Sequence, residues 1–165
     1  MKKLGMALLI AAILLGGCAA QPVYEGLEGL NVDAQAPVMK NIHIDLPRDA
    51  SVQAVRGEDR RIYFCDGYEI MVETLAGGDL DKSLRSLTGF SKDALTVLST
   101  RLDGVTQYSC VWTSIGETGE QVGRLTIYDD GVYHYCVSVT APADNALTLQ
   151  PVFQALFDSF TLEAV

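Results

Sequence analysis

The sequence is poor in basic residues: 12 Lys and Arg stand against 21 Asp and Glu, which gives a formal net charge of −9. Such a chain cannot neutralise a run of phosphates, so we expect no nucleic-acid partner. Only 20% of its residues are charged and 48% are hydrophobic, which excludes a disordered chain. With 5 Pro and 15 Gly, it is neither collagen-like nor of low complexity.

The sequence also lacks the short motifs that mark many enzymes. It contains no GxSxG elbow, no Walker A loop and no GxGxxG fingerprint. It has 2 His, and no CxxC or HxxxH pair with the spacing of metal ligands. We therefore assign no catalytic residue, no metal site and no cofactor from the sequence.

No apolar run reaches the length of about 20 residues that a membrane-spanning helix needs. The run after Lys2 and Lys3 extends only from Leu4 to Leu15 and ends in small residues. This arrangement is typical of a signal peptide, which we expect over residues 1–17.

The end of this segment, Leu15-Gly16-Gly17-Cys18, resembles the bacterial lipobox. The resemblance implies cleavage before Cys18, a diacylglycerol thioether on its sulfur and often a fatty amide on the new amino group. The alternative is an ordinary secretory signal in which Cys18 is incidental. A lipid on Cys18 predicts an extracytoplasmic protein that is anchored to the bacterial cell membrane. Residues 18–40 show no sustained period, and we expect them to form the lipidated N-terminus and a flexible tether.

We expect residues 41–165 to form a single globular domain. Alternation of apolar and polar residues, with turn residues between, predicts strands over 41–46, 51–55, 61–73, 107–115, 121–128, 132–140 and 160–162. Two sets of apolar residues are expected to face the core: Ile62, Phe64, Tyr68, Ile70 and Val72 in the early strands, and Leu125, Ile127, Tyr133, Tyr135, Val137 and Val139 in the later ones. The other, wetter face would then carry Arg124, Thr126, His134, Cys136 and Ser138.

Helices are predicted in three places. Asp79 can cap a helix in which Leu80, Leu84 and Leu87 form one stripe. Ser91 can cap a second helix with Leu95, Leu98 and Leu102 as its buried face, ending at Gly104. After a loop over residues 141–145, a last helix begins near Gln150 or Pro151, with an apolar stripe from Val152 to Phe160. The fold class is therefore α+β: one antiparallel sheet of about six strands, with two or three helices packed on one face.

This order of elements, together with particular residues, resembles a known family. The residues are Tyr133 to Thr140 (YHYCVSVT), Ala141-Pro142, and Phe153 through Phe160. They resemble the PsbP-like superfamily, which includes the photosystem II extrinsic protein and bacterial lipoproteins of the DcrB and LpqN type. The resemblance covers residues 41–163 and implies scaffolding, assembly or ligand binding, mostly without catalysis. No functional residue of the family is carried over.

Four side chains are candidates for a surface role: His134, Cys136, Trp112 and Tyr108. His134 lies two residues from Cys136, so the pair could act as base and thiol, or bind zinc with Cys65 or Cys110. The simpler interpretation is that Cys65, Cys110 and Cys136 are small apolar residues in strands, with at most one disulfide among them. Trp112 and Tyr108 could stack a sugar or a peptide, but core packing is the simpler interpretation for a single Trp.

The sequence therefore favours a non-catalytic, membrane-anchored binding or assembly module of the cell envelope, with an envelope protein or a glycan as its partner. The alternatives are a small hydrolase or thiol-dependent enzyme that uses Cys136 and His134, and a solute-binding lipoprotein. A binding surface should appear as an exposed apolar or aromatic patch on the open face of the sheet.

Replacing Cys18 by Ser removes the sulfur that accepts the lipid, so Cys18→Ser should leave unprocessed or unlipidated precursor. The measurement is incorporation of radiolabelled palmitate in cells, with the wild-type chain as control. Normal incorporation by the variant would contradict the lipobox interpretation.

Overall fold

The computed structural model describes residues 38–53, 59–117 and 119–165, which belong to one compact unit. The predicted signal peptide, Cys18 and residues 18–37 of the tether lie outside the described residues. None of the helices in the described ranges is long and apolar enough to cross a membrane.

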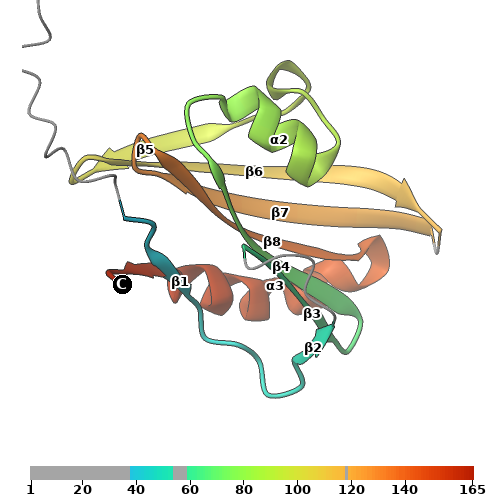
Figure 1. The fold of residues 1–165 in the computed structure, drawn as a ribbon. Helices are drawn as coiled ribbons and strands as arrows, with labels where there is room; N and C mark the ends of the chain where they lie inside the picture. Colours follow the sequence, from blue (N-terminus) through green and yellow to red (C-terminus); the bar gives the residue numbers. More distant parts are fainter. Residues whose placement is uncertain (1–37, 54–58, 118) are drawn as a thin grey trace, which may run out of the picture. The chain divides into compact units, whose positions relative to one another are not determined.

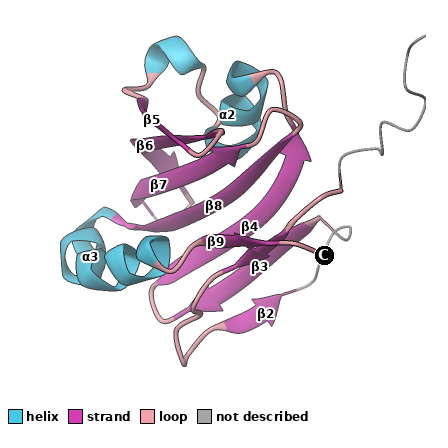
Figure 2. Ribbon diagram, turned by 90° about the vertical axis from the view of Figure 1, so that its left-hand side faces the viewer, coloured by secondary structure: helices cyan, strands magenta, loops and turns pink. Residues whose placement is uncertain are grey.

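The described chain is dominated by strands (Figures 1 and 2). Its elements are β1 (Asn41–His43), β2 (Ser51–Gln53), β3 (Arg60–Cys65), β4 (Tyr68–Ala76), α2 (Leu80–Thr88), the 3-10 helix η1 (Lys92–Ala94), β5 (Leu98–Leu102), β6 (Val105–Gly116), β7 (Gly119–Asp129), β8 (Tyr133–Pro142), α3 (Ala143–Asp158) and β9 (Thr161–Glu163). A sheet of 7 strands has the order β2-β3-β4-β8-β7-β6-β5, and every neighbouring pair is antiparallel. The α+β class with an antiparallel sheet is confirmed.

The two α-helices pack on opposite faces of the sheet, not on one face as predicted (Figure 1). Odd-numbered residues of β8, including Tyr135 and Val137, join a core with α3, to which Phe153, Leu156 and Phe157 contribute. The even-numbered Cys136 belongs to a second core with Leu84 and Leu87 of α2. Because both faces of β8 are apolar, each needs a cover, and one helix supplies each.

Turn lengths explain why the predicted faces of the strands were wrong. Ile127 lies opposite Cys136 and Leu125 opposite Ser138, so these residues share the α2 face. In the earlier hairpin, Tyr63 lies opposite Ile70, so odd residues of β3 join even residues of β4. Four residues separate Asp129 from its partner His134, and two separate Cys65 from its partner Tyr68. An even number of residues between two paired residues gives the partners opposite parity, and a shift of one residue moves a whole strand's side chains to the other face.

The predicted second helix is wrong: only Lys92–Ala94 is helical, and Leu98–Leu102 is strand β5. The spacing of Leu95, Leu98 and Leu102 fits a helical stripe, yet Leu98, Thr100 and Leu102 also alternate along a strand. Asp103 and Gly104 have φ values of 51° and 83° and turn the chain into β6. This conformation matches a two-residue hairpin turn rather than a helix end.

The last helix starts earlier than predicted. It begins at Ala143, so residues 143–145 are helical and Pro151 lies inside the helix. Val152 is exposed, whereas Phe153, Leu156 and Phe157 are buried. The predicted helix over residues 80–88 is confirmed: the Asp79 carboxylate accepts from the Lys82 N–H at 2.9 Å.

The start of the described chain is held against its end and against β8. Strand β1 pairs with β9 over three residues, from Asn41 opposite Glu163 to His43 opposite Thr161. The Lys40 N–H donates to the Tyr135 hydroxyl at 3.1 Å, and that hydroxyl donates to Asp130 at 3.1 Å. The Lys40 ammonium also forms an ion pair with the Asp130 carboxylate, at 3.6 Å.

The indole of Trp112 lies against Gly123, the residue opposite it in β7. A Cβ atom at Gly123 would overlap the indole ring, so Gly123→Ala should displace Trp112 and cost about 2–3 kcal/mol of unfolding free energy. Urea unfolding followed by the fluorescence of this single Trp measures both effects. Gly116→Ala is the control, because its Cβ meets the flexible Gln121 side chain. Equal stability of the two variants would contradict this packing.

Candidate functional site

His134 lies between a serine and an aspartate, the composition of a catalytic triad. Its Nδ1 is 2.7 Å from the Ser83 hydroxyl of α2, and its Nε2 is 3.6 Å from an Asp129 carboxylate oxygen. With the ring proton on Nε2, Nδ1 accepts from the Ser83 hydroxyl. His134 is 1% exposed and Ser83 is also buried, so no substrate reaches this hydroxyl. The group instead ties α2 to the sheet through a buried hydrogen bond.

Cys136 is placed to pack rather than to react. It lies in the core under α2, and its thiol donates to the His134 carbonyl at 3.4 Å. Burial raises the pKa of this thiol, and the charge of Glu73 raises it further. A nucleophilic thiol needs a lowered pKa, so this setting opposes the thiol-enzyme alternative.

The three described cysteines are free. Cys110 of β6 and Cys136 of β8 are separated by β7, which puts two strand spacings, about 9–10 Å, between their backbones. A disulfide needs Cα atoms within about 7 Å, so this pair cannot close in the folded sheet. Among the residues that the structure describes, no three His, Cys, Asp or Glu side chains gather in a way that could hold a metal ion.

The other two candidates, Trp112 and Tyr108, lie on the α2 face. Trp112 is buried, and Tyr108 packs against the same core. Of the four predicted surface candidates, His134, Cys136 and Trp112 are therefore buried, because α2 covers the face that was expected to be wet.

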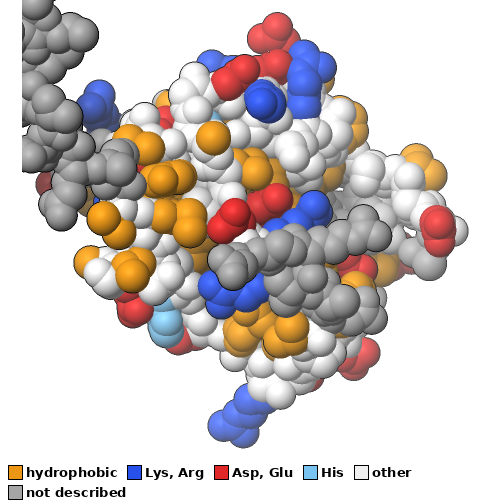
Figure 3. All heavy atoms as spheres, viewed as in Figure 1, with side chains coloured by type: hydrophobic (Ala, Val, Ile, Leu, Met, Phe, Trp, Pro, Cys, Tyr) orange, Lys and Arg blue, Asp and Glu red, His pale blue; other side chains and the backbone are white. Residues whose placement is uncertain are grey.

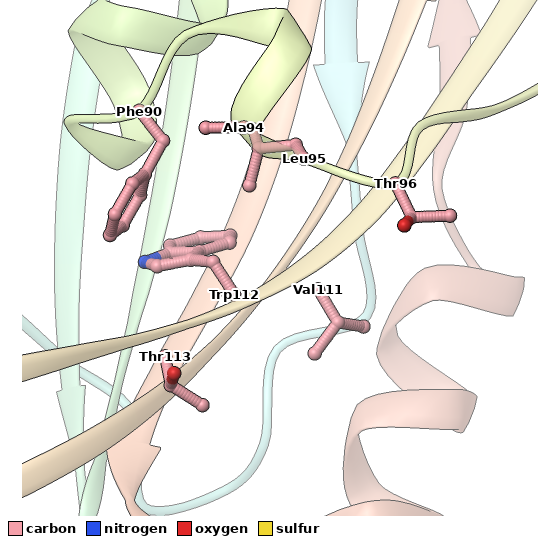
Figure 4. Close-up of a pocket in the computed structure, with 7 residues that line it drawn as sticks. All are labelled: Phe90, Ala94, Leu95, Thr96, Val111, Trp112 and Thr113. Atoms are coloured by element: carbon pink, nitrogen blue, oxygen red, sulfur yellow. The ribbon is translucent and has the colours of Figure 1, made fainter.

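One edge of Trp112 lines a cleft of about 370 Å³ at the outer edge of β6 (Figure 4). Phe90 and Leu95 lie on the same side of β6 as the indole, whereas Val111 and Thr113 point the other way. The remaining lining residues are Ala94, the last residue of η1, and Thr96, in the segment that leads to β5. The cleft therefore contacts both faces of β6 at its margin.

Beside this cleft, β6 has a strand on one side only. Strand β5 pairs with Val105–Ser109, while β7 pairs along β6 as far as Gly116. No described strand pairs with the outer edge of residues 110–116, and Figure 1 shows the β6–β7 hairpin extending past α2. Continuing the β5 register would put Thr96 opposite Val111, but the chain leaves the sheet before that point.

This edge lacks the features that usually protect an exposed strand. Residues 110–116 read CVWTSIG, with no charged residue and no Pro. Val111 is 59% exposed and Ile115 is 83% exposed. Natural edge strands are commonly guarded by charge, proline or a bulge, and an unguarded apolar edge is prone to pair with another chain.

No described helix covers the face of β5 and β6 on the α3 side, and we call it the open face. Helix α3 packs on β7 and β8, and residues 160–162 approach the open face at one end. The side chains of the open face are uncharged: Leu98, Thr100, Leu102, Val105, Gln107, Ser109, Val111, Thr113 and Ile115. At one end it continues into a hollow of about 520 Å³ that Tyr128, Phe160 and Leu162 help to line.

No protein-family model matches the chain, and no curated protein matches it in sequence. Solved structures do resemble its fold. Cyanobacterial PsbP (CyanoP) from Synechocystis has a TM-score of 0.54 and 13% identity, over 78% of this chain and 95% of that one. LpqN of Mycobacterium tuberculosis, described as involved in cell envelope biogenesis, has a TM-score of 0.50 and 12% identity, over 79% of this chain and 88% of that one.

A crystal structure from Bacteroides thetaiotaomicron has a TM-score of 0.50 and 11% identity over 74% of this chain. The chain spans only 45% of the length of that protein. At identities this low, the comparisons show the fold alone: the domain has a PsbP-like fold, as the resemblance in the sequence implied.

Thiol alkylation distinguishes packing cysteines from a catalytic one. Cys65 is half-buried, and burial raises its pKa; Cys110 and Cys136 are buried, and burial raises the pKa of Cys110 to about 11 and that of Cys136 further. Iodoacetamide at pH 8 should therefore modify Cys65 first, and Cys110 and Cys136 at the rate of unfolding. Peptide mapping by mass spectrometry measures the order, with urea-unfolded protein as control. Fastest labelling at Cys136 would revive the thiol-enzyme alternative.

Proposed function

We propose that this protein is an extracytoplasmic lipoprotein, anchored through an acylated Cys18, whose domain binds a protein of the cell envelope without catalysis. The observation that carries the proposal is the open face. Four of its apolar side chains are more than half exposed: Leu98 is 68%, Leu102 is 73%, Val111 is 59% and Ile115 is 83% exposed. Apolar side chains exposed along one face of neighbouring strands are the kind of surface that commonly marks an interaction site.

The charge of the chain makes the open face distinctive. The whole sequence carries a formal net charge of −9, yet no side chain of the open face is charged. Figure 3 shows a gathering of hydrophobic side chains near β1 and the adjacent ends of the long strands, with charged groups mostly elsewhere on that side. A partner that contacts the open face therefore need not desolvate a charge of this protein.

The buried chemistry supports a binding role rather than catalysis. Ser83 and His134 are closed off, and Cys136 has a raised pKa. The cleft beside Trp112 and the hollow beside Leu162 both lie at the margin of the sheet, next to its outer strands. The envelope location is supported by the lipobox, and by the likeness in fold to LpqN, whose description concerns cell envelope biogenesis.

Charge placed on the open face should abolish partner capture without unfolding the domain. The doubly substituted Leu102→Lys, Ile115→Lys chain should lose the photo-crosslinked adduct formed in cells from a benzophenone amino acid at Gln107. The free energy of unfolding should change by no more than about 1 kcal/mol, about 0.5 kcal/mol for each substitution, because both side chains are exposed.

The matched control is Leu147→Lys on α3, since Leu147 is 83% exposed, as is Ile115. This variant should retain the adduct. An adduct that survives the double substitution, or no adduct with any envelope protein from the wild-type chain, would refute the open face as the contact surface.

A further inference from the structure

We propose that the outer edge of β6, from Val111 to Gly116, binds an extended and uncharged peptide segment of a partner protein as an added strand. This inference rests on the proposed function, because it specifies how the partner is held. It concerns the backbone of β6 and the cleft beside Trp112, whereas the proposed function needs only the side chains of the open face.

The backbone groups on the outer edge of β6 determine which kind of molecule can bind there. In a strand, the N–H and C=O groups of alternate residues point to opposite edges. Strand β7 takes up the inner edge of β6 from Thr106 to Gly116, while β5 covers the outer edge only as far as Ser109. A second strand, about 4.8 Å away, has donors and acceptors at the spacing that the remaining outer edge presents.

The side chains on both sides of this edge are uncharged. On the α2 side, an added strand would meet the Trp112 indole, with Phe90 and Leu95 closing the cleft of about 370 Å³. On the other side it would meet Val111, Thr113 and Ile115. Because side chains of a strand alternate, the fitting peptide has apolar or hydroxyl residues in alternation, with one large apolar residue in the cleft. A charged residue at that position would be desolvated without a counter-charge.

The segment beside the cleft favours a narrow peptide over a second copy of this chain. Ala94, Leu95 and Thr96 face Val111–Thr113 across the cleft. An antiparallel pairing of two copies about Thr113 would bring this segment of each copy against the β6 edge of the other. A single extended chain occupies one strand spacing and avoids that conflict.

The test uses the full-length chain in detergent and the capped peptide acetyl-Thr-Val-Thr-Phe-Thr-Val-Thr-amide. Binding is followed by the fluorescence of Trp112, the only Trp of the sequence, which should shift to the blue and saturate as the cleft fills. Two further peptides carry N-methyl groups on alternate residues, either the odd set or the even set. Strand addition uses one edge of the peptide, so one set should bind at least about tenfold more weakly, and the other within about twofold of the parent.

Variants locate the peptide on the protein. Thr113→Lys should weaken binding of the parent peptide by about tenfold or more, because it sets a charge beside the added strand. The control is Leu147→Lys on α3. Leu147 is as exposed as Ile115, so this variant should bind the parent peptide as the wild-type chain does. Amide proton exchange at residues 111–116 should slow in the presence of the peptide.

Several outcomes would overturn the inference. They are no saturable shift up to 1 mM peptide, equal binding of both N-methylated peptides, and unchanged binding to Thr113→Lys. A concentration-dependent dimer that Thr113→Lys abolishes, with no peptide binding, would assign the edge to a second copy. If the peptides do not bind but the cellular crosslinked adduct still depends on Leu102 and Ile115, strand addition is wrong and the proposed function is retained. If no crosslinked adduct forms in cells while the peptides bind as expected, the open face is not the contact surface.

Discussion

The fold depends on the burial of both faces of β8. Tyr135 and Val137 are covered by α3, while His134 and Cys136 are covered by α2. A strand without a solvent-facing side has to lie inside the sheet, and β8 accordingly lies between β4 and β7. Both helices pack against this central part of the sheet. No described helix therefore covers β5 and β6 on the α3 side, and the open face is a consequence of where the two cores lie.

Local signals predicted the elements that depend on near neighbours in the sequence. The Asp79 cap and the leucine stripe identified α2, and alternation identified the long strands. The faces of the strands were predicted less well, because parity across a hairpin depends on the number of residues in the turn. The segment around Leu98 satisfied both the helical and the strand period, so its spacing alone could not decide between them. Pro151 suggested a helix start, although α3 accommodates it in its interior.

The candidate site was harder to predict because backbone groups form much of it. His134, Cys136 and Trp112 were selected for the chemistry of their side chains, and all three are buried. What leaves the β6 edge free is a difference in length: β6 has 12 residues and β5 has 5. The sequence does carry one usable signal, the uncharged run CVWTSIG, which ends at a hairpin. Only the order of strands in the sheet shows that no described strand pairs with one side of this run.

The short β1–β9 pair also affects how the domain responds to tension on its chain. The pair joins only three residues of each strand, from Asn41 opposite Glu163 to His43 opposite Thr161, so few hydrogen bonds hold it. It forms a separate 2-stranded sheet, and β1 precedes every strand of the 7-stranded sheet along the chain. Tension applied through the amino-terminal side would open this pair and the Lys40 contacts with Tyr135 and Asp130 before it strained the central strands.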